Sequence, residues 1–269
     1  MKCFTPYNLE INMRKRTLVI CSSVLLLLLS ACGGGGNETT IPPAGTPGAG
    51  PAGPAAPPAT ATLSGKILFE GTPPPNAKIQ MSADPYCAKS SDNPMTEDYK
   101  VSDGGLENVI VYVSSTVNAS FPTPTEALEI DQTHCHYVPH VFTIMVNQPL
   151  KIKNSDETLH NIHSFSETNE QYNVGQAMKG MVNDTKFTKA EMPVPFKCDV
   201  HKWMSAFAGV FTHPYHTVSK GGGAYEIKLA PGSYEITAWH EKLGPMKQTI
   251  DVKDGSNELN FSFKPTSAD

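Results

Sequence analysis

A cluster of metal-binding residue types lies in the C-terminal half of the chain. Cys198, His201 and Met204 place a thiolate, an imidazole and a thioether three residues apart, and His160 and His163 precede them. One sulfur and two imidazole nitrogens in a plane, with a weak axial thioether, suit both Cu(I) and Cu(II). The spacing therefore predicts a copper site that passes single electrons.

Zinc and paired copper ions fit this pattern less well. Structural zinc sites usually contain two Cys-x-x-His-type pairs or a matching His pair, and a thioether is a poor zinc ligand. Two-copper electron-transfer centres need a second Cys in the ligand loop, and Asp199 and Val200 do not supply it. We therefore expect one mononuclear copper per chain.

The N-terminus has the pattern of an export signal. Arg14, Lys15 and Arg16 precede an apolar run over 17–29, and Ala31-Cys32 follows. The run is short for a transmembrane helix. Residues 29–32 resemble a bacterial lipobox, which predicts a lipoprotein signal peptide over 1–31 and lipidation of Cys32; an ordinary signal peptide is the alternative. We expect anchorage in the cell envelope, facing the periplasm or the exterior, and Gly33 favours the outer membrane.

Removal of residues 1–31 makes the chain more acidic. These residues hold four of the 21 Lys and Arg and one of the 26 Asp and Glu, so the formal charge moves from −5 to −8. Nucleic acid is therefore not an expected partner. A negative surface can attract a basic redox partner at low salt, although solubility alone also explains the charge.

The cysteine count bears on the copper prediction. The chain has six cysteines. Two leave with the signal and Cys32 is lipidated, so Cys87, Cys135 and Cys198 remain. Two of these should pair in an oxidising compartment. We favour Cys87 with Cys135, which leaves Cys198 as the metal thiolate; another pairing stays open.

The rest of the chain indicates an all-β fold. Residues 32–60 are a Gly-, Pro- and Ala-rich linker, too poor in bulky apolar residues to form a core. Beyond it, no long stretch has sustained helical periodicity, and 166–192 is irregular enough for a loop or a short helix. Short β-rich runs separated by turn residues predict a β-sandwich. They are 62–70, 108–114, 140–146, 149–153, 159–165, 194–198, 208–212, 224–229, 233–239, 247–252 and 258–263.

Residues 106–212 resemble the cupredoxins, blue copper proteins of the plastocyanin and amicyanin type, through the Cys-x-x-His-x-x-Met loop and a His-Asn pair. The resemblance implies a Greek-key sandwich in which His160, Cys198 and His201 bind copper in a plane and Met204 binds axially. It also implies that Asn161 ties the ligand loop to the first-ligand strand near the sulfur, and that electrons pass through an exposed edge of His201. His160 is preferred to His163 because it matches the His-Asn pair, and the two residues face opposite ways on a strand.

A second β portion completes the expected organisation. Residues 61–212 form the cupredoxin-like domain, and 213–269 weakly resemble carboxypeptidase-regulatory-like β-sandwiches. Residues 61–80 belong to either part, since 63–71 resemble the opening of such sandwiches.

No catalytic motif is evident, so we expect no enzyme. Asp156 and Glu191 are interpreted as solvated loop charges. His134, His136 and His140 leave a second copper or zinc site open. The predicted function is a membrane-tethered electron carrier between a redox donor and a redox acceptor. The alternatives are a copper-holding or copper-delivery lipoprotein and a metal-free β-sandwich binding module at the envelope.

Overall fold

The computed structural model describes residues 54–90 and 94–265, and these are nearly all β. The predicted all-β sandwich class is confirmed. The signal segment, Cys32 and most of the expected linker lie outside the described residues. In the described ranges, no helix has the length and apolar character needed to cross a membrane.

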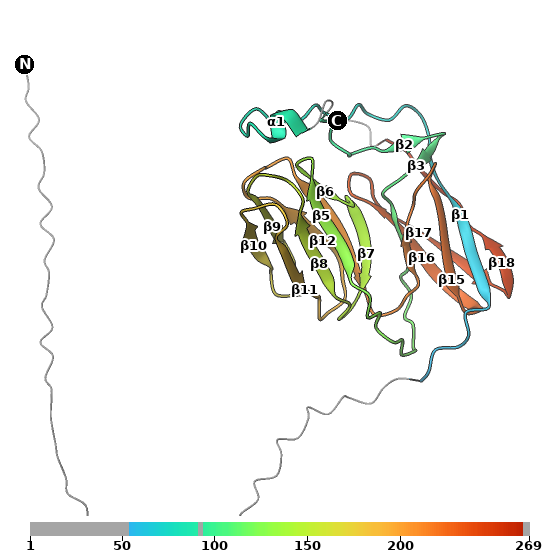
Figure 1. The fold of residues 1–269 in the computed structure, drawn as a ribbon. Coiled ribbons are helices and arrows are strands. Elements are labelled where there is room, and N and C mark those ends of the chain that lie inside the picture. The colour runs from blue at the N-terminus through green and yellow to red at the C-terminus, as the bar shows by residue number, and fades with distance from the viewer. Residues whose placement is uncertain (1–53, 91–93, 266–269) are drawn as a thin grey trace, which may run out of the picture. The chain divides into compact units, whose positions relative to one another are not determined.

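Two sheets around one hydrophobic core form what we call the first sandwich (Figure 1). One sheet has the order β10-β9-β12-β13-β7 and the other β11-β8-β5-β6. Its strands are β5 (Leu128–Thr133), β6 (His136–Val138), β7 (Val141–Met145), β8 (Leu150–Asn154), β9 (His160–Ser164), β10 (Asn173–Gln176), β11 (Val182–Thr185), β12 (Glu191–Lys197) and β13 (Ser205–Phe211).

Alternating burial explains why these strands pair as they do. In β8 the residues Leu150, Ile152 and Asn154 are buried, and the lysines between them are less buried. This period of two is that of a strand with one face on a core. In β12, Val194 and Phe196 turn into the same core.

The other two sheets form the second sandwich. One has the order β15-β1-β3-β2, with β18 and β19 also paired to β1, and the other has the order β14-β4-β16-β17. Its strands are β1 (Ala61–Phe69), β2 (Val101–Ser102), β3 (Gly105–Leu106), β4 (Ile110–Val113), β14 (His216–Val218), β15 (Ala224–Leu229), β16 (Gly232–His240), β17 (Gly244–Val252), β18 (Gly255–Glu258) and β19 (Phe261–Phe263).

Strand pairing groups the chain differently from the sequence-based ranges. β1 to β4 fall within the range 61–212, yet β1 and β4 pair with strands from the C-terminal portion, and β3 and β2 extend the sheet from β1. Their apolar side chains, such as Leu63, Leu106 and Val111, lie in the core of the second sandwich. Within the range of the expected linker, Ala55 forms an isolated β-bridge with Ser120.

A third apolar cluster joins the two sandwiches. Ile110 of β4, Val141 of β7 and Phe211 of β13 are buried together. Beside them, His140 before β7 forms an ion pair with Glu241, which follows β16. Both members of this pair are largely buried, so the contact between the sandwiches is apolar with one embedded charge pair.

Residues 79–90, which we call the covering segment, cross one end of the first sandwich (Figure 1). They contain the short helix α1 (Cys87–Ser90). Asp84 starts the helix, because its carboxylate accepts hydrogen bonds from the backbone N–H groups of Tyr86 and Cys87. Cys87 forms a disulfide with Cys135, the pair favoured by the cysteine count. The disulfide fixes this segment over the loops that carry the candidate ligands.

Candidate metal centre

A tight loop between β12 and β13 carries three of the predicted ligands. Cys198 directly follows β12, and Met204 directly precedes β13. The loop is closed by two backbone hydrogen bonds, from Cys198 N–H to the Met204 carbonyl at 3.3 Å and from Met204 N–H to the His201 carbonyl at 2.9 Å. Cys198, His201 and Met204 are all buried. Three donor-bearing side chains are thus held in one compact turn.

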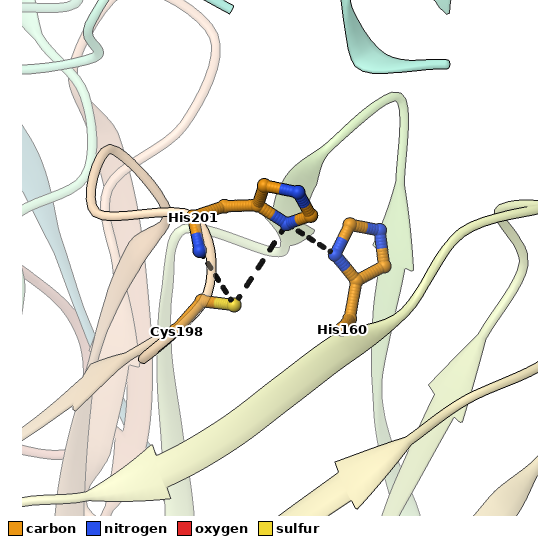
Figure 2. A group of neighbouring side chains, drawn as sticks. All are labelled: His160, Cys198 and His201. Atoms are coloured by element: carbon orange, nitrogen blue, oxygen red, sulfur yellow. Dashed lines mark hydrogen bonds between the residues drawn. The ribbon is translucent and has the colours of Figure 1, made fainter. Parts of the chain in front are cut away.

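His160 reaches the same point from β9. β12 pairs with β9 and brings Lys197 opposite His163, so the first residue of β9 lies near the start of the ligand loop. Figure 2 shows the imidazoles of His160 and His201 facing each other beside the sulfur of Cys198. His160 has no solvent-exposed surface.

The separations fit a single metal ion. The two Nδ1 atoms are 3.0 Å apart, and the Cys198 sulfur is 3.9 Å from the His201 Nδ1. With metal–nitrogen bonds of about 2.0–2.1 Å and metal–sulfur bonds of about 2.3 Å, donors sharing an ion lie within roughly 4.4 Å of each other. Both separations are within this limit, and the ligand atoms of His160, Cys198 and His201 all lie within 4.8 Å of one another.

The outer nitrogens of both imidazoles are bound to carboxylates. His160 Nε2 lies 2.8 Å from Asp156 Oδ2, and His201 Nε2 lies 3.1 Å from Asp84 Oδ2. A proton on each Nε2 satisfies these contacts and leaves the Nδ1 lone pairs free, which is the tautomer that metal ligation needs. Two lone pairs 3.0 Å apart repel each other unless a proton or a metal ion lies between them.

The surroundings favour positive charge at this point. Burial lowers the pKa of His160, but the hydrogen bonds that its imidazole donates to Asp156 and Cys198 outweigh it and raise the pKa overall. Burial raises the pKa of the Cys198 thiol, but hydrogen bonds from His160, His201 and Asn161 lower it to about 6. Cys198 is the single free cysteine among the described residues, and its thiolate form is the one that binds metals.

Both outer carboxylates are held in their ionised forms. Burial raises the pKa of Asp84, but hydrogen bonds from Thr158, Cys87, His201 and Tyr86 lower it to about 2. The pKa of Asp156 is likewise lowered, because the hydrogen bonds from His160, Cys135 and His134 outweigh burial. Two negative charges therefore lie on the far sides of the two imidazoles.

Asn161 links the two ligand-bearing elements. Its backbone N–H donates to the Cys198 sulfur at 3.4 Å, and its side-chain oxygen accepts from the Asp199 N–H at 3.0 Å. The backbone N–H of His201 also donates to the sulfur, at 3.2 Å. Hydrogen bonds to a ligating sulfur tune the potential of a copper site.

His163 lies apart from this group. Its Nδ1 contacts Asp199 at 3.1 Å, and its side chain is partly exposed. Its ring stacks on Phe165. The structure thus brings His160, and not His163, next to Cys198 and His201.

The prediction that one edge of the His201 imidazole is exposed to solvent is wrong. His201 is only 3% exposed, because Asp84 and the Cys87 sulfur, 3.8 Å from its Nε2, cover that edge. Trp203 packs at 4.9 Å between ring centroids and donates its Nε1–H to the Cys135 carbonyl. The covering segment encloses the imidazole that the resemblance placed at the surface.

The interpretation of Asp156 and Glu191 as solvated charges is also wrong. Asp156 is 1% exposed and contacts His160. Glu191 accepts hydrogen bonds from Ser166 and Asn169, which organise the loop after β9. Sequence reasoning missed Asp84 because it is 117 residues from His201. Asp156 is only four residues from His160, but its sequence neighbourhood does not distinguish it from a solvated carboxylate such as Glu157.

The other histidines do not form a second group of close donors. His136 Nδ1 contacts the His134 carbonyl, and His140 contacts the Ser205 carbonyl and Glu241. In the described part of the chain, none of the groups of three neighbouring donor atoms includes these three residues.

No protein-family model matches the chain, and no curated protein matches it. Solved structures that are similar to part of the chain include a copper-containing nitrite reductase, amicyanin and a purple cupredoxin. A copper-containing nitrite reductase from Thermus scotoductus SA-01 is 18% identical with a TM-score of 0.30, over 37% of this chain and 25% of the reductase. The chain therefore matches only a quarter of that enzyme.

Two smaller proteins are matched over most of their length. A point mutant of amicyanin in the reduced state is 20% identical with a TM-score of 0.28, over 31% of this chain and 81% of amicyanin. A purple cupredoxin from Nitrosopumilus maritimus is 19% identical with a TM-score of 0.27, over 30% of this chain and 97% of that protein.

Proposed function

We propose that this chain binds one copper ion through His160, Cys198 and His201, with Met204 as the axial ligand, and carries single electrons. The observation that supports this most directly is the buried meeting of two Nδ1 atoms at 3.0 Å beside a thiol whose pKa is lowered to about 6. Two imidazoles, one thiolate and a nearby thioether form a donor set that suits both copper oxidation states.

A copper ion held by these residues would supply one-electron chemistry through its Cu(II) and Cu(I) states. The chain's residues provide the rest. The loop hydrogen bonds preset the donor positions, and the covering segment excludes water from His201. A carrier gains from such rigidity because little has to move when the charge changes.

The setting in the cell belongs to the same proposal. The lipobox-like Cys32 and the long linker suit a carrier tethered to a membrane of the cell envelope, with redox proteins as donor and acceptor. We also propose that the chain transfers electrons and does not itself catalyse a reaction.

The test is the visible absorption spectrum of the full chain after copper loading and oxidation. We expect the intense absorption of a copper–thiolate bond and one copper per chain. Cys198→Ser should abolish the colour, whereas His163→Ala, which removes an imidazole from the same strand as His160, should keep it. Absence of copper binding in the unmodified chain would contradict the proposal and favour a metal-free binding module.

The burial of His201 favours one other candidate, a copper-holding protein. An imidazole that is 3% exposed offers a partner little direct contact, which suits retention of the ion as well as electron transfer. The electron self-exchange rate of the copper-loaded chain separates the two. Exchange that is slow compared with that of amicyanin measured alongside it would favour copper holding.

A further inference from the structure

We propose that Asp84 and Asp156 are paired positioning residues that hold the two imidazoles for copper and shift the site toward Cu(II). This inference rests on the proposed function. Each carboxylate contacts the outer nitrogen of one imidazole, Asp156 that of His160 and Asp84 that of His201. The two contacts come from different parts of the chain and meet at one site.

Asp84 is fixed on both oxygens. Its Oδ2 accepts from the Thr158 hydroxyl at 2.7 Å as well as from His201, and its Oδ1 accepts from the N–H groups of Tyr86 and Cys87. Four donors on one carboxylate leave it little freedom to rotate. The direction from which it meets His201 is therefore set before any metal binds.

Asp156 is fixed in the same manner but deeper. Its Oδ2 accepts from the Cys135 N–H at 2.8 Å and its Oδ1 from the His134 N–H at 2.9 Å, in addition to the contact with His160. A buried carboxylate costs free energy unless such donors compensate it. Its retention at 1% exposure indicates a site built around this charge.

The disulfide holds both carboxylates in place. The Cys87 N–H donates to Asp84, and the Cys135 N–H donates to Asp156, so each half of the disulfide binds one of them. Tyr86 adds a second link, with its N–H on Asp84 and its hydroxyl 3.2 Å from Asp156. The covering segment thus positions the two charges relative to each other.

The effect on copper follows from the charge. A carboxylate that accepts the Nε2–H makes the imidazole a more basic ligand and fixes its orientation. More basic ligands and nearby negative charge stabilise Cu(II) more than Cu(I), because the attraction grows with the charge of the ion. Loss of either carboxylate should therefore raise the reduction potential.

The test is a redox titration of the copper-loaded full chain, followed through its visible absorption. We expect Asp84→Asn, which keeps an acceptor oxygen and loses the charge, to reduce the preference for Cu(II) about tenfold, a rise of about 59 mV for one electron. Asp156→Asn should act in the same direction. Glu157→Gln, which removes an exposed carboxylate beside Asp156, is the matched control and should leave the potential unchanged.

Thr158→Val should shift the reduction potential in the opposite direction from the two Asp→Asn variants, and it leaves both carboxylates in place. The Thr158 hydroxyl shares Asp84 Oδ2 with His201, so its removal should strengthen the bond to His201 and lower the potential. The melting temperature of each copper-free variant separates a structural effect from tuning. Variants that bind copper with the wild-type potential would overturn this inference and leave the proposed function standing. An unmodified chain that binds no copper would overturn the proposed function instead.

Discussion

The Nδ1 atoms of His160 and His201 face each other at 3.0 Å and are buried beneath the covering segment at one end of the first sandwich. In the copper-free chain this contact needs a proton to relieve the repulsion of two lone pairs. Under the proposed function, these two nitrogens and the sulfur of Cys198 would hold a copper ion in place of that proton.

Copper should therefore stabilise the folded chain. At a free concentration about one hundred times the Kd, binding adds about 2.7 kcal/mol, since the unfolded chain lacks an assembled site. For a chain of this size we expect the Tm to rise by on the order of 5–10 °C. Calorimetry with and without copper measures this rise in Tm. Cys198→Ser should lose most of the rise, and an equal rise in that variant would show that copper binds elsewhere.

Acid should destabilise the fold through two histidines that have buried ring nitrogens without hydrogen-bond partners. Neither ring nitrogen of His216 has a partner, nor does His240 Nε2. Burial, with the neighbouring His213 for His216 and His140 for His240, lowers both pKa values to about 4. The unfolded chain protonates these groups near about pH 6.5, so stability is complete above that pH and falls as the pH drops toward 4.

The measurement is urea unfolding at about pH 7 and about pH 4.5, on either side of the unfolded-state pKa. His216→Phe should remove on the order of 2–3 kcal/mol of the loss between these values, because Phe keeps the ring that stacks on Phe211. His163→Asn, which changes a partly exposed histidine, should lose as much unfolding free energy between these two pH values as the unmodified chain does. The interpretation fails if His216→Phe loses as much stability in acid as the unmodified chain.

Much of the candidate site could be predicted because its donors are close in the sequence. Cys198, His201 and Met204 share one loop, and a loop spacing is a local property. Asp84 could not be predicted, since it reaches His201 only through the fold. Asp156 is four residues before His160, but its burial, which separates it from the exposed Glu157, also comes from the fold. The burial of His201 could not be predicted either, because the covering segment that encloses it is distant in sequence.

The strands that the sequence did not reveal have few apolar residues. β10 and β11 lie in the 166–192 segment that was expected to be a loop or a short helix, and each is the outermost strand of its sheet. An edge strand needs few buried side chains, so Asn173–Gln176 and Val182–Thr185 show little hydrophobic pattern. β5 was also missed, since its apolar residues are separated by acidic and amide side chains.

Removal of the disulfide should weaken the fold and open the metal centre. Cys87 and Cys135 are 48 residues apart, and loop-closure entropy for that length gives about 4 kcal/mol. We expect Cys87→Ala with Cys135→Ala to lose stability up to this amount in urea unfolding. Copper should also pass to a chelator faster, because the segment that covers His201 is no longer tied down. An unchanged rate of copper loss would show that the covering segment does not control access.

The pair His140 and Glu241 should stabilise the contact between the two sandwiches in a pH-dependent way. Burial lowers the pKa of His140, but the hydrogen bond and charge of Glu241 outweigh it and raise the pKa. The stabilisation by the charged pair is therefore complete below about pH 6.5 and is lost as the pH rises through the pKa of His140 in the folded chain.

Glu241→Gln should lower the free energy of unfolding by about 1–3 kcal/mol at about pH 6 and by less at about pH 9, measured by urea unfolding. Glu235→Gln, which changes a partly exposed carboxylate that contacts Lys247 and Ser114, should cost less than about 1 kcal/mol, and the same amount at both pH values. A cost for Glu241→Gln that is equal at both pH values would mean that the imidazole is neutral throughout and that the charge of His140 does not hold the two sandwiches together.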